Sequence, residues 1–522
     1  MDLRRRSDRD VSRIAGSAMR GGDFRAAREA FREFVKRRPN HAKAWMCLGE
    51  CTAKVGFVHE AIECMKRGVE LDGTVSAYQS ALADLLFAVG DGAGSLDCAR
   101  RALALNSENS AAHALVGRNL DRLGRTGEAI EYLTNVFAAR PGDGRVGLAL
   151  GQLYLRCDRH AEARAAFDRI IGESAWSADD GAEDVLQSAW NGLGQVLDRT
   201  GDYEEAFSAF EKCGQLTARS REAAGLDREQ AFGRIVAIRQ AFDGLATKGK
   251  KVERGGEVGT TFSGPAFLVG FPRSGTTLAE QILSAHREVV TSGERPILDV
   301  TGQAWSRMAG EGASMIELVK SLDRHVVTEL RRVYREAAVQ LVGAEVEGHL
   351  LVDKQPLNIT DLGIIELLFP ESKVIVMIRD PRDVCLSCFF QDFRLNSSMV
   401  QFLSLKDAAR YYNAVMGLYS ELRKVVGLDI VEFRYEELVS DFANQARKMI
   451  EHLGLGWDRA VLRFQERVGN RSTIITTPSA AAVTEGVNRK AVGRWRRYEK
   501  WLCDPRVDRY LSSHVEALGY RQ

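Results

Sequence analysis

The chain has 522 residues, so at roughly 150 residues per domain it should hold about two to four domains. Charged residues make up 27% of the chain, hydrophobic residues 45%, and only 10 residues are proline, which excludes a disordered protein and favours a helical one. The formal net charge of +1 argues against a protein that coats nucleic acid, because such a surface needs a strong basic excess.

The N-terminal arginines are not followed by an apolar segment, and no stretch of about 18 apolar residues occurs in the sequence. We therefore expect a cytoplasmic protein without a membrane span. The nine cysteines are an odd number in a chain with no export signal, which favours reduced thiols. Cys385 and Cys388 have the spacing of a redox or zinc motif, but no second cysteine or histidine pair stands at ligand spacing, so no metal site is expected.

A repeat of 34 residues begins near the N-terminus. It is marked first by a small residue, at Ala15, Gly49, Ala83, Gly117 and Gly151. Twelve residues later stands another small residue, and four residues further a bulky one, except at Ala99. These are the small residues Ala27, Ala61, Ser95, Ala129 and Ala163, and the bulky residues Phe31, Met65, Leu133 and Phe167. After an insertion at residues 172–183 the pattern returns with Gly194, Ala206 and Phe210.

This pattern resembles tetratricopeptide repeats, in which each unit is a hairpin of two helices. Small residues let the two helices approach, and large residues fill the seam with the next unit. We predict an α-solenoid of about six repeats over residues 8–220, with a groove for a peptide, a partner protein or the neighbouring domain. A connecting helix and a linker rich in lysine, glycine and glutamate are expected at residues 221–262.

A phosphate-binding loop is predicted after the linker. Residues 266–269 form a short apolar strand, residues 270–275 a tight turn, and Thr276 begins a helix whose first amides can bind an anion. The spacing from Gly270 to Gly275 is that of a Walker A motif, but Thr276 stands where lysine is required. This departure disfavours a nucleoside-triphosphate enzyme and favours a nucleotide with a single 5′-phosphate at this point.

Two further strands are predicted at residues 350–352 and 374–378, alternating with helical stretches such as 361–369. This alternation indicates a parallel sheet that binds ligands at the carboxyl ends of its strands. Lys354 and Arg379 stand at two of these ends, and Ser387 follows Arg379 by eight residues. A helix between them would bring the hydroxyl and the guanidinium to the same side, where they can clamp a second phosphate.

These residues resemble a known family. The segment from Phe271 to Leu278 is similar to the 5′-phosphosulfate loop of sulfotransferases that use 3′-phosphoadenosine 5′-phosphosulfate (PAPS), and the segment from Arg379 to Ser387 is similar to their 3′-phosphate motif. The resemblance covers about residues 264–498, and the whole layout resembles bacterial tetratricopeptide sulfotransferases. It implies an α/β P-loop-like sulfotransferase domain with a parallel sheet over residues 263–522. The nucleotide-binding residues that it implies are Arg273, Ser274, Gly275, Thr276, Thr277, Arg379, Ser387, Tyr435 and Arg494.

Within this superfamily the chain is most similar to tyrosylprotein sulfotransferases. The shared features are Arg273, the pair Ala285 and His286, the pair Gly293 and Glu294, Lys354, Tyr435, and Ser479 ahead of Gly493, Arg494 and Trp495. The resemblance implies that Glu294 is the catalytic base, that Arg273, Lys354 and Ser479 stabilise the transferring group, and that Tyr435 and Arg494 flank the nucleotide. Gln391 and residues 480–486 depart from the family pattern. These departures concern the segment that covers the nucleotide and the residues that determine acceptor specificity.

The chemistry requires the same residue types. A base must take the proton of the acceptor hydroxyl, and cations must stabilise the charge on the leaving oxygen. Glu294 supplies the base, and Arg273 and Lys354 supply cations without a metal, while His286 is expected to be structural. We predict transfer of a sulfuryl group from PAPS to protein tyrosine recruited by the solenoid. The alternatives are a sugar or small phenol as acceptor, and an interaction protein that has lost activity.

Overall fold

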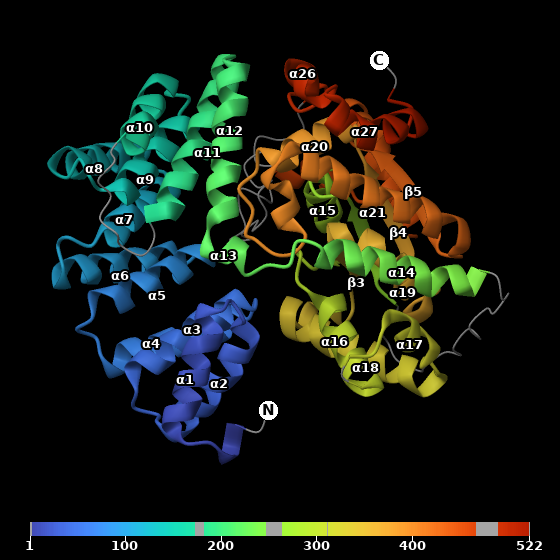
Figure 1. The fold of residues 1–522 in the computed structure, drawn as a ribbon, viewed down its shortest axis with the longest axis horizontal. Coiled ribbons are helices and arrows are strands. Elements are labelled where there is room, and N and C mark those ends of the chain that lie inside the picture. Colours follow the sequence, from blue (N-terminus) through green and yellow to red (C-terminus); the bar gives the residue numbers. More distant parts are fainter. Residues whose placement is uncertain (1–2, 173–181, 247–263, 311, 466–488, 521–522) are drawn as a thin grey trace. The chain divides into compact units, whose positions relative to one another are not determined.

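The computed structural model describes residues 3–172, 182–246, 264–310, 312–465 and 489–520 (Figure 1). The chain divides into two compact units, Met1–Leu226 and Asp227–Gln522. Within the described residues, no helix combines the length and the apolar character needed to cross a membrane.

The first unit is built from helices that pack in consecutive pairs, and each pair also contacts the next. The helices are α1 (Asp8–Arg20), α2 (Phe24–Arg37), α3 (Ala42–Lys54), α4 (Val58–Leu71), α5 (Ser76–Ala88), α6 (Gly92–Leu105), α7 (Ser110–Arg122), α8 (Thr126–Ala139), α9 (Gly144–Arg156), α10 (His160–Gly172), α11 (Ala182–Thr200), α12 (Tyr203–Arg219) and α13 (Arg221–Ala224). This is the predicted solenoid of helix hairpins.

The turn inside each hairpin adds a second marker of the repeat. A residue with positive φ ends the first helix of each pair, and Gly22, Gly56, Gly90, Gly124, Asp158 and Gly201 occupy these turns. The five glycines accept the left-handed backbone without strain, while Asp158 adopts it at φ 54°. The sequence therefore carried a turn signal at the same interval as the small residues.

The glycines of the repeat explain why the period is strict. A Cβ atom added at Gly49 would lie 2.6 Å from the Met65 side chain, and one at Gly151 would lie 2.7 Å from the Phe167 ring. The bulky residue therefore packs against the glycine of its own hairpin. Phe167 also packs against the next unit, because a Cβ atom added at Gly192 of α11 would lie 2.4 Å from its ring.

We expect Gly151→Ala to destabilise the first unit by about 1–3 kcal/mol, the usual cost of overpacking a core. Phe167 is completely buried between Gly151 and Gly192, so its rigid ring cannot move aside for a new methyl group. The matched control is Gly127→Ala in α8, where an added Cβ meets nothing within 4 Å. Thermal unfolding followed by circular dichroism measures both variants, and equal midpoints would contradict the packing argument.

The strands of the second unit form one parallel sheet in the described residues, in the order β2-β3-β1-β4-β5. They are β1 (Ala266–Gly270), β2 (Val289–Thr291), β3 (Leu350–Lys354), β4 (Lys373–Ile378) and β5 (Asp429–Arg434). The chain runs from β1 to one side of the sheet and then crosses to the other, so the topological switch point lies between β1 and β4. Ligands of open α/β sheets bind outside the carboxyl ends of the strands at such a point.

Helices pack on both faces of this sheet. On one face, Leu268 and Ile375 form a core cluster with apolar residues of α15 and α23. On the other, the Phe267 ring lies 6.4 Å from Tyr334 of α18. The helices of this unit are α14 (Gln230–Ala246), α15 (Thr276–Ser284), α16 (Ile297–Ala309), α17 (Met315–Lys320), α18 (Arg324–Val342), α19 (Leu362–Leu368), α20 (Pro381–Phe389), α21 (Leu405–Val425), α22 (Tyr435–Ser440), α23 (Phe442–His452), α26 (Glu499–Leu502) and α27 (Pro505–Ala517).

The structure confirms the predicted fold class, a helical solenoid followed by an α/β domain with a parallel sheet. It differs in detail. The predicted helix at 361–369 is preceded by the 3-10 helix η3 (Pro356–Asp361), and β5 was not predicted. Helix α14 lies in the second unit, where Arg234 forms an ion pair of 2.5 Å with Asp361 at the end of η3.

Candidate active site

Five of the predicted site residues stand at the carboxyl ends of the five strands. Glu294 follows β2, Lys354 ends β3, Arg273 follows β1, Arg379 follows β4, and Tyr435 follows β5. Because the strands are parallel, these ends share one edge of the sheet, and the residues follow one another along it in that order. Arg273 and Arg379 thus lie on either side of the switch point between β1 and β4.

The loop after β1 has the backbone of an anion-binding turn. Arg273 and Gly275 adopt positive φ angles of 70° and 101°, and Ser274 closes the turn by donating its amide and its hydroxyl to the Phe271 carbonyl. Gly275 is the N-cap of α15 and offers no side-chain acceptor to the first amides of the helix. These first residues include Thr276 and Thr277, whose side chains are buried. The helix N-terminus therefore suits a phosphate or sulfate group.

The position of Gly275 also requires a residue without a side chain. A Cβ atom there would lie 2.6 Å from the Tyr435 ring. Tyr435 thus packs on the loop after β1 from the start of α22, and its half-buried ring closes that side of the site. The loop, Tyr435 and Arg379 meet, since the Arg379 guanidinium lies 4.8 Å from the centre of the Tyr435 ring.

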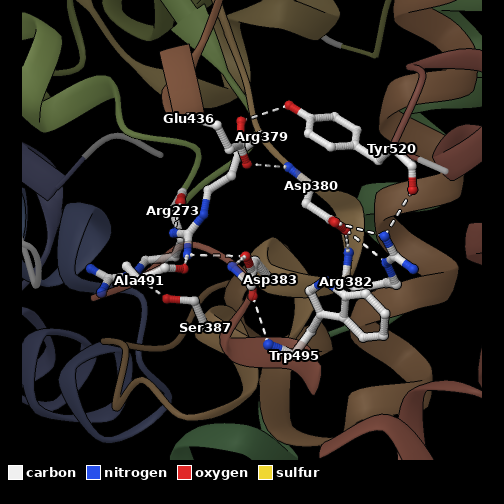
Figure 2. A network of polar contacts seen from close by, with 11 residues as sticks. Arg273, Arg379, Asp380, Arg382, Asp383, Ser387, Glu436, Ala491, Trp495 and Tyr520 are labelled. Carbon is white, nitrogen blue, oxygen red and sulfur yellow. Dashed lines mark hydrogen bonds and ion pairs between the residues drawn. The ribbon is translucent and has the colours of Figure 1, made fainter. Parts of the chain in front are cut away.

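Arg273, Arg379 and Ser387 are held together by direct contacts (Figure 2). Arg379 donates to the Arg273 carbonyl at 3.0 Å, and the Arg273 Nε donates to the Ser387 hydroxyl of α20 at 3.0 Å. The predicted pair Arg379 and Ser387 therefore converges on the loop after β1. The contact of Arg273 with Ser387 was not predicted, because sequence spacing relates Ser387 only to Arg379.

A C-terminal segment is attached to the same cluster through Asp383. This carboxylate lies 3.9 Å from Arg379 and accepts the amides of Gly493 and Trp495 at 2.7 and 2.8 Å (Figure 2). Trp495 in turn packs against the Arg382 guanidinium at 3.6 Å. The segment places Arg494, the first residue of the 3-10 helix η6 (Arg494–Tyr498), beside Phe390 at 5.0 Å.

The electrostatics of the cluster call for an anion. Burial lowers the pKa of Arg273 to about 10, and the cations of Arg379 and Arg494 contribute to the shift. Arg379 is 6% exposed, and in the described residues its Nε is a buried donor without a hydrogen-bond acceptor. Buried donors are nearly always satisfied. An anionic ligand with more than one charged group would both satisfy this donor and relieve the repulsion among the three arginines.

The predicted base and lysine lie together on the other half of the edge. The Lys354 Nζ is 2.5 Å from Glu294 Oε1, and the amide of Glu294 donates to the Lys354 carbonyl at 3.1 Å. The Lys354 side chain is completely buried, whereas 31% of the Glu294 side chain is exposed. Glu294 adopts a left-handed backbone with a φ of 63° in the turn after β2. The Glu294 carboxylate is thus accessible to a ligand, whereas the Lys354 ammonium is buried behind it.

Two buried acids near this pair were not predicted. Glu280 of α15 forms an ion pair of 3.0 Å with Lys354, and Asp353 accepts the hydroxyls of Tyr334 and Ser292. Burial raises the pKa of Asp353 to about 6. Both acids stand within apolar stretches, Glu280 in a helix and Asp353 in a strand, and an acidic residue inside such a stretch is a signal that the sequence did offer.

The remaining predicted residues behave differently. His286 has both ring nitrogens engaged by backbone, with the Gly456 carbonyl at 2.8 Å and the Glu288 amide at 3.2 Å, which fits a structural role. Ser479 and residues 480–486 lie outside the described residues. Cys385 and Cys388 are free and buried, and burial raises the pKa of both thiols. The described part of the chain has no group of three or more potential metal ligands.

Comparisons with known proteins match both units. Residues 265–459 match a family model described as "Sulfotransferase family", and residues 13–72, 122–178 and 187–217 match tetratricopeptide-repeat models. Among solved structures, a MamA protein is 26% identical over 31% of this chain and 88% of its own, with a TM-score of 0.28.

Three curated relatives are similar over parts of the chain. An uncharacterized protein of Aquifex aeolicus is 28% identical over 61% of this chain and 42% of its own length. Protein-tyrosine sulfotransferase 2 of Gallus gallus is 27% identical over 44% and 62%, and nodulation protein NoeE of Sinorhizobium fredii is 32% identical over 46% and 61%. The matches therefore span less than two thirds of the length of each relative.

Proposed function

We propose that this chain, which carries tetratricopeptide repeats and a domain of the sulfotransferase family, transfers a sulfuryl group from PAPS to the hydroxyl of protein tyrosine. The observation that carries the proposal is the row of side chains along the sheet edge, with Arg273 and Arg379 at the switch point and a carboxylate-lysine pair beside them. The same arrangement argues against a fold that has lost its activity, since an interaction surface has no need of it.

The residues at the switch point fit the nucleotide of PAPS. Its 5′-phosphosulfate would lie on the loop after β1 and the first amides of α15, and its 3′-phosphate on Arg379 and Ser387. The Nε of Arg379, which has no acceptor among the described residues, supports this fit, because a phosphate oxygen is the acceptor that a buried guanidinium prefers. PAPS supplies an activated sulfuryl group whose bond to the phosphate oxygen breaks as the acceptor oxygen bonds to sulfur.

Glu294 and Lys354 would then have separate roles, one in proton uptake and the other in charge stabilisation. Glu294 takes the proton of the acceptor hydroxyl as that oxygen attacks. A protonated Glu294 no longer attracts the Lys354 ammonium, which at 2.5 Å is its present partner. The Lys354 ammonium, together with Arg273, can then stabilise the negative charge on the leaving phosphate oxygen. Proton uptake at one residue is thereby coupled to charge stabilisation at the other.

Tyrosine as the acceptor is supported by the similarity to Protein-tyrosine sulfotransferase 2 and by the solenoid, which can recruit a protein. The test is to supply labelled PAPS to the full chain with a cell lysate, with and without a chelator. Label on protein tyrosine supports the proposal. Label on a glycan or small molecule shifts the acceptor to those classes, and no transfer to any acceptor overturns the proposal.

A shortened chain beginning at Asp227 tests recruitment by the solenoid. For a protein acceptor we expect KM to rise while kcat stays nearly unchanged, because a remote docking surface contributes uniform binding. For a small phenol neither parameter should change. The cut keeps α14, which pairs with Asp361 in the second unit. Circular dichroism and nucleotide binding must first show that the shortened chain is folded; an unchanged KM for the protein acceptor then refutes recruitment.

A further inference from the structure

Glu280 connects the two halves of the carboxylate-lysine pair. One of its oxygens lies 3.0 Å from the Lys354 Nζ, and the other accepts the amide of Gly293 at 3.0 Å. Gly293 directly precedes Glu294, so a single carboxylate of α15 contacts both the lysine and the backbone that presents the base. Glu280 is 3% exposed and Lys354 is completely buried.

Glu280 adds a second carboxylate beside Lys354, and burying this carboxylate is costly. Burial raises the pKa of Glu280, the ammonium of Lys354 lowers it, and the carboxylate of Glu294 raises it. Among the described residues, Arg295 and Asp353 also interact electrostatically with Glu280. Lys354 alone would balance one acid, so Glu280 and Glu294 compete for the same ammonium.

We propose that Glu280 is a positioning residue that holds Lys354 in place while Glu294 takes up its proton. The inference rests on the proposed function. Once Glu294 is protonated, Glu280 is the partner that keeps the buried ammonium at the strand end. Before that step, its negative charge weakens the hold of Lys354 on Glu294 and so keeps the base available. Its contact with the Gly293 amide fixes the turn that carries Glu294.

The test compares the full chain with E280Q, K354M, the double variant and E288Q. E280Q keeps the shape of the side chain and an acceptor for the Gly293 amide but removes the charge. We expect kcat to fall by about 10²-fold, the cost of misplacing a reacting group by about an ångström, with the KM for PAPS little changed. E288Q makes the same change at an exposed glutamate of the loop before β2 and should leave kcat unchanged.

Two further measurements separate positioning from a merely structural role. In the K354M background E280Q should lower kcat no further, because the residue acts through Lys354. E280Q alone should move the acidic limb of the kcat profile to lower pH, because removing a neighbouring negative charge favours the ionised form of the base. Equal losses in both backgrounds, or an unmoved acidic limb, would overturn the inference.

The unfolding midpoints of the same variants test the contact between Glu280 and Lys354 independently of catalysis. Replacing Lys354 leaves the buried Glu280 carboxylate without its cation, and replacing Glu280 removes one of the two carboxylates that pair with Lys354. The stability lost in the double variant should therefore be smaller than the sum of the losses in the two single variants. Additive shifts would overturn the inference. A wild-type chain that transfers no sulfuryl group would instead overturn the proposed function, and the unfolding cycle would still decide whether Glu280 and Lys354 are coupled.

Discussion

Replacing Glu294 with glutamine should lower turnover by about 10²–10⁴-fold, the usual contribution of a general base. The amide cannot take the proton of the acceptor hydroxyl, yet it has nearly the same shape as the carboxylate and can remain beside Lys354. Nucleotide affinity should stay nearly intact, because the arginine cluster lies at the ends of β1 and β4 and not at β2. Steady-state kinetics and calorimetry on the same preparation measure the two quantities.

The exposed Glu288 provides the control for this variant, since E288Q removes a carboxylate close by in the sequence without touching Lys354. Turnover of E294Q within a few-fold of the unmodified chain would remove Glu294 from the base role. His286 would be a poor replacement, because both of its ring nitrogens are already engaged by backbone groups.

Replacing Arg379 with alanine should weaken binding of 3′-phosphoadenosine 5′-phosphate by about 1.5–3 kcal/mol, or roughly tenfold to 150-fold in Kd. This is the range for hydrogen bonds to charged groups, and the buried Nε of Arg379 has such a bond to offer. The loss should be much smaller for adenosine 5′-phosphate, which lacks the 3′-phosphate. Calorimetry with both nucleotides gives the difference directly.

An exposed arginine serves as the control for this charge loss. The Arg287 side chain is 80% exposed and lies 4.0 Å from Asp458, so Arg287→Ala should leave both affinities unchanged. An equal loss for the two nucleotides in the Arg379 variant would show that this residue supports the fold of the loop after β1, whose Arg273 carbonyl it contacts, and does not recognise the 3′-phosphate.

The parts of the structure that follow from local pattern could be predicted from the sequence. The interval from Gly49 to Gly151 identified the hairpins, because each small residue packs on a bulky one at a fixed distance along the chain. The loop after β1 was likewise predicted, since a strand, a tight turn and a helix N-terminus are contiguous. Lys354 was placed at the binding edge because it follows a predicted strand, whereas Glu294 was assigned only through the resemblance to tyrosylprotein sulfotransferases. The structure places the two side chains in an ion pair.

Contacts between distant segments were not predicted. The ion pair of Glu280 with Lys354 joins residues on a helix and a strand whose order in the sheet the sequence does not state. The same holds for Asp383, which binds amides of a segment more than a hundred residues away. β5 was missed because its strand pattern is weak, with half-buried and charged residues along most of its length.

The strand order has a consequence for how such a site can diversify. The groups proposed to hold the donor belong to β1, β4 and β5, whereas the base and its lysine belong to β2 and β3, and the loop after β1 stands between them. In the proposed function, the sheet thus separates the groups that hold the nucleotide from the base that faces the acceptor. Substitutions around β2 that leave Lys354 in place would then change which hydroxyl is accepted without altering the groups proposed to hold the nucleotide, so one donor chemistry can serve several acceptors on the same scaffold.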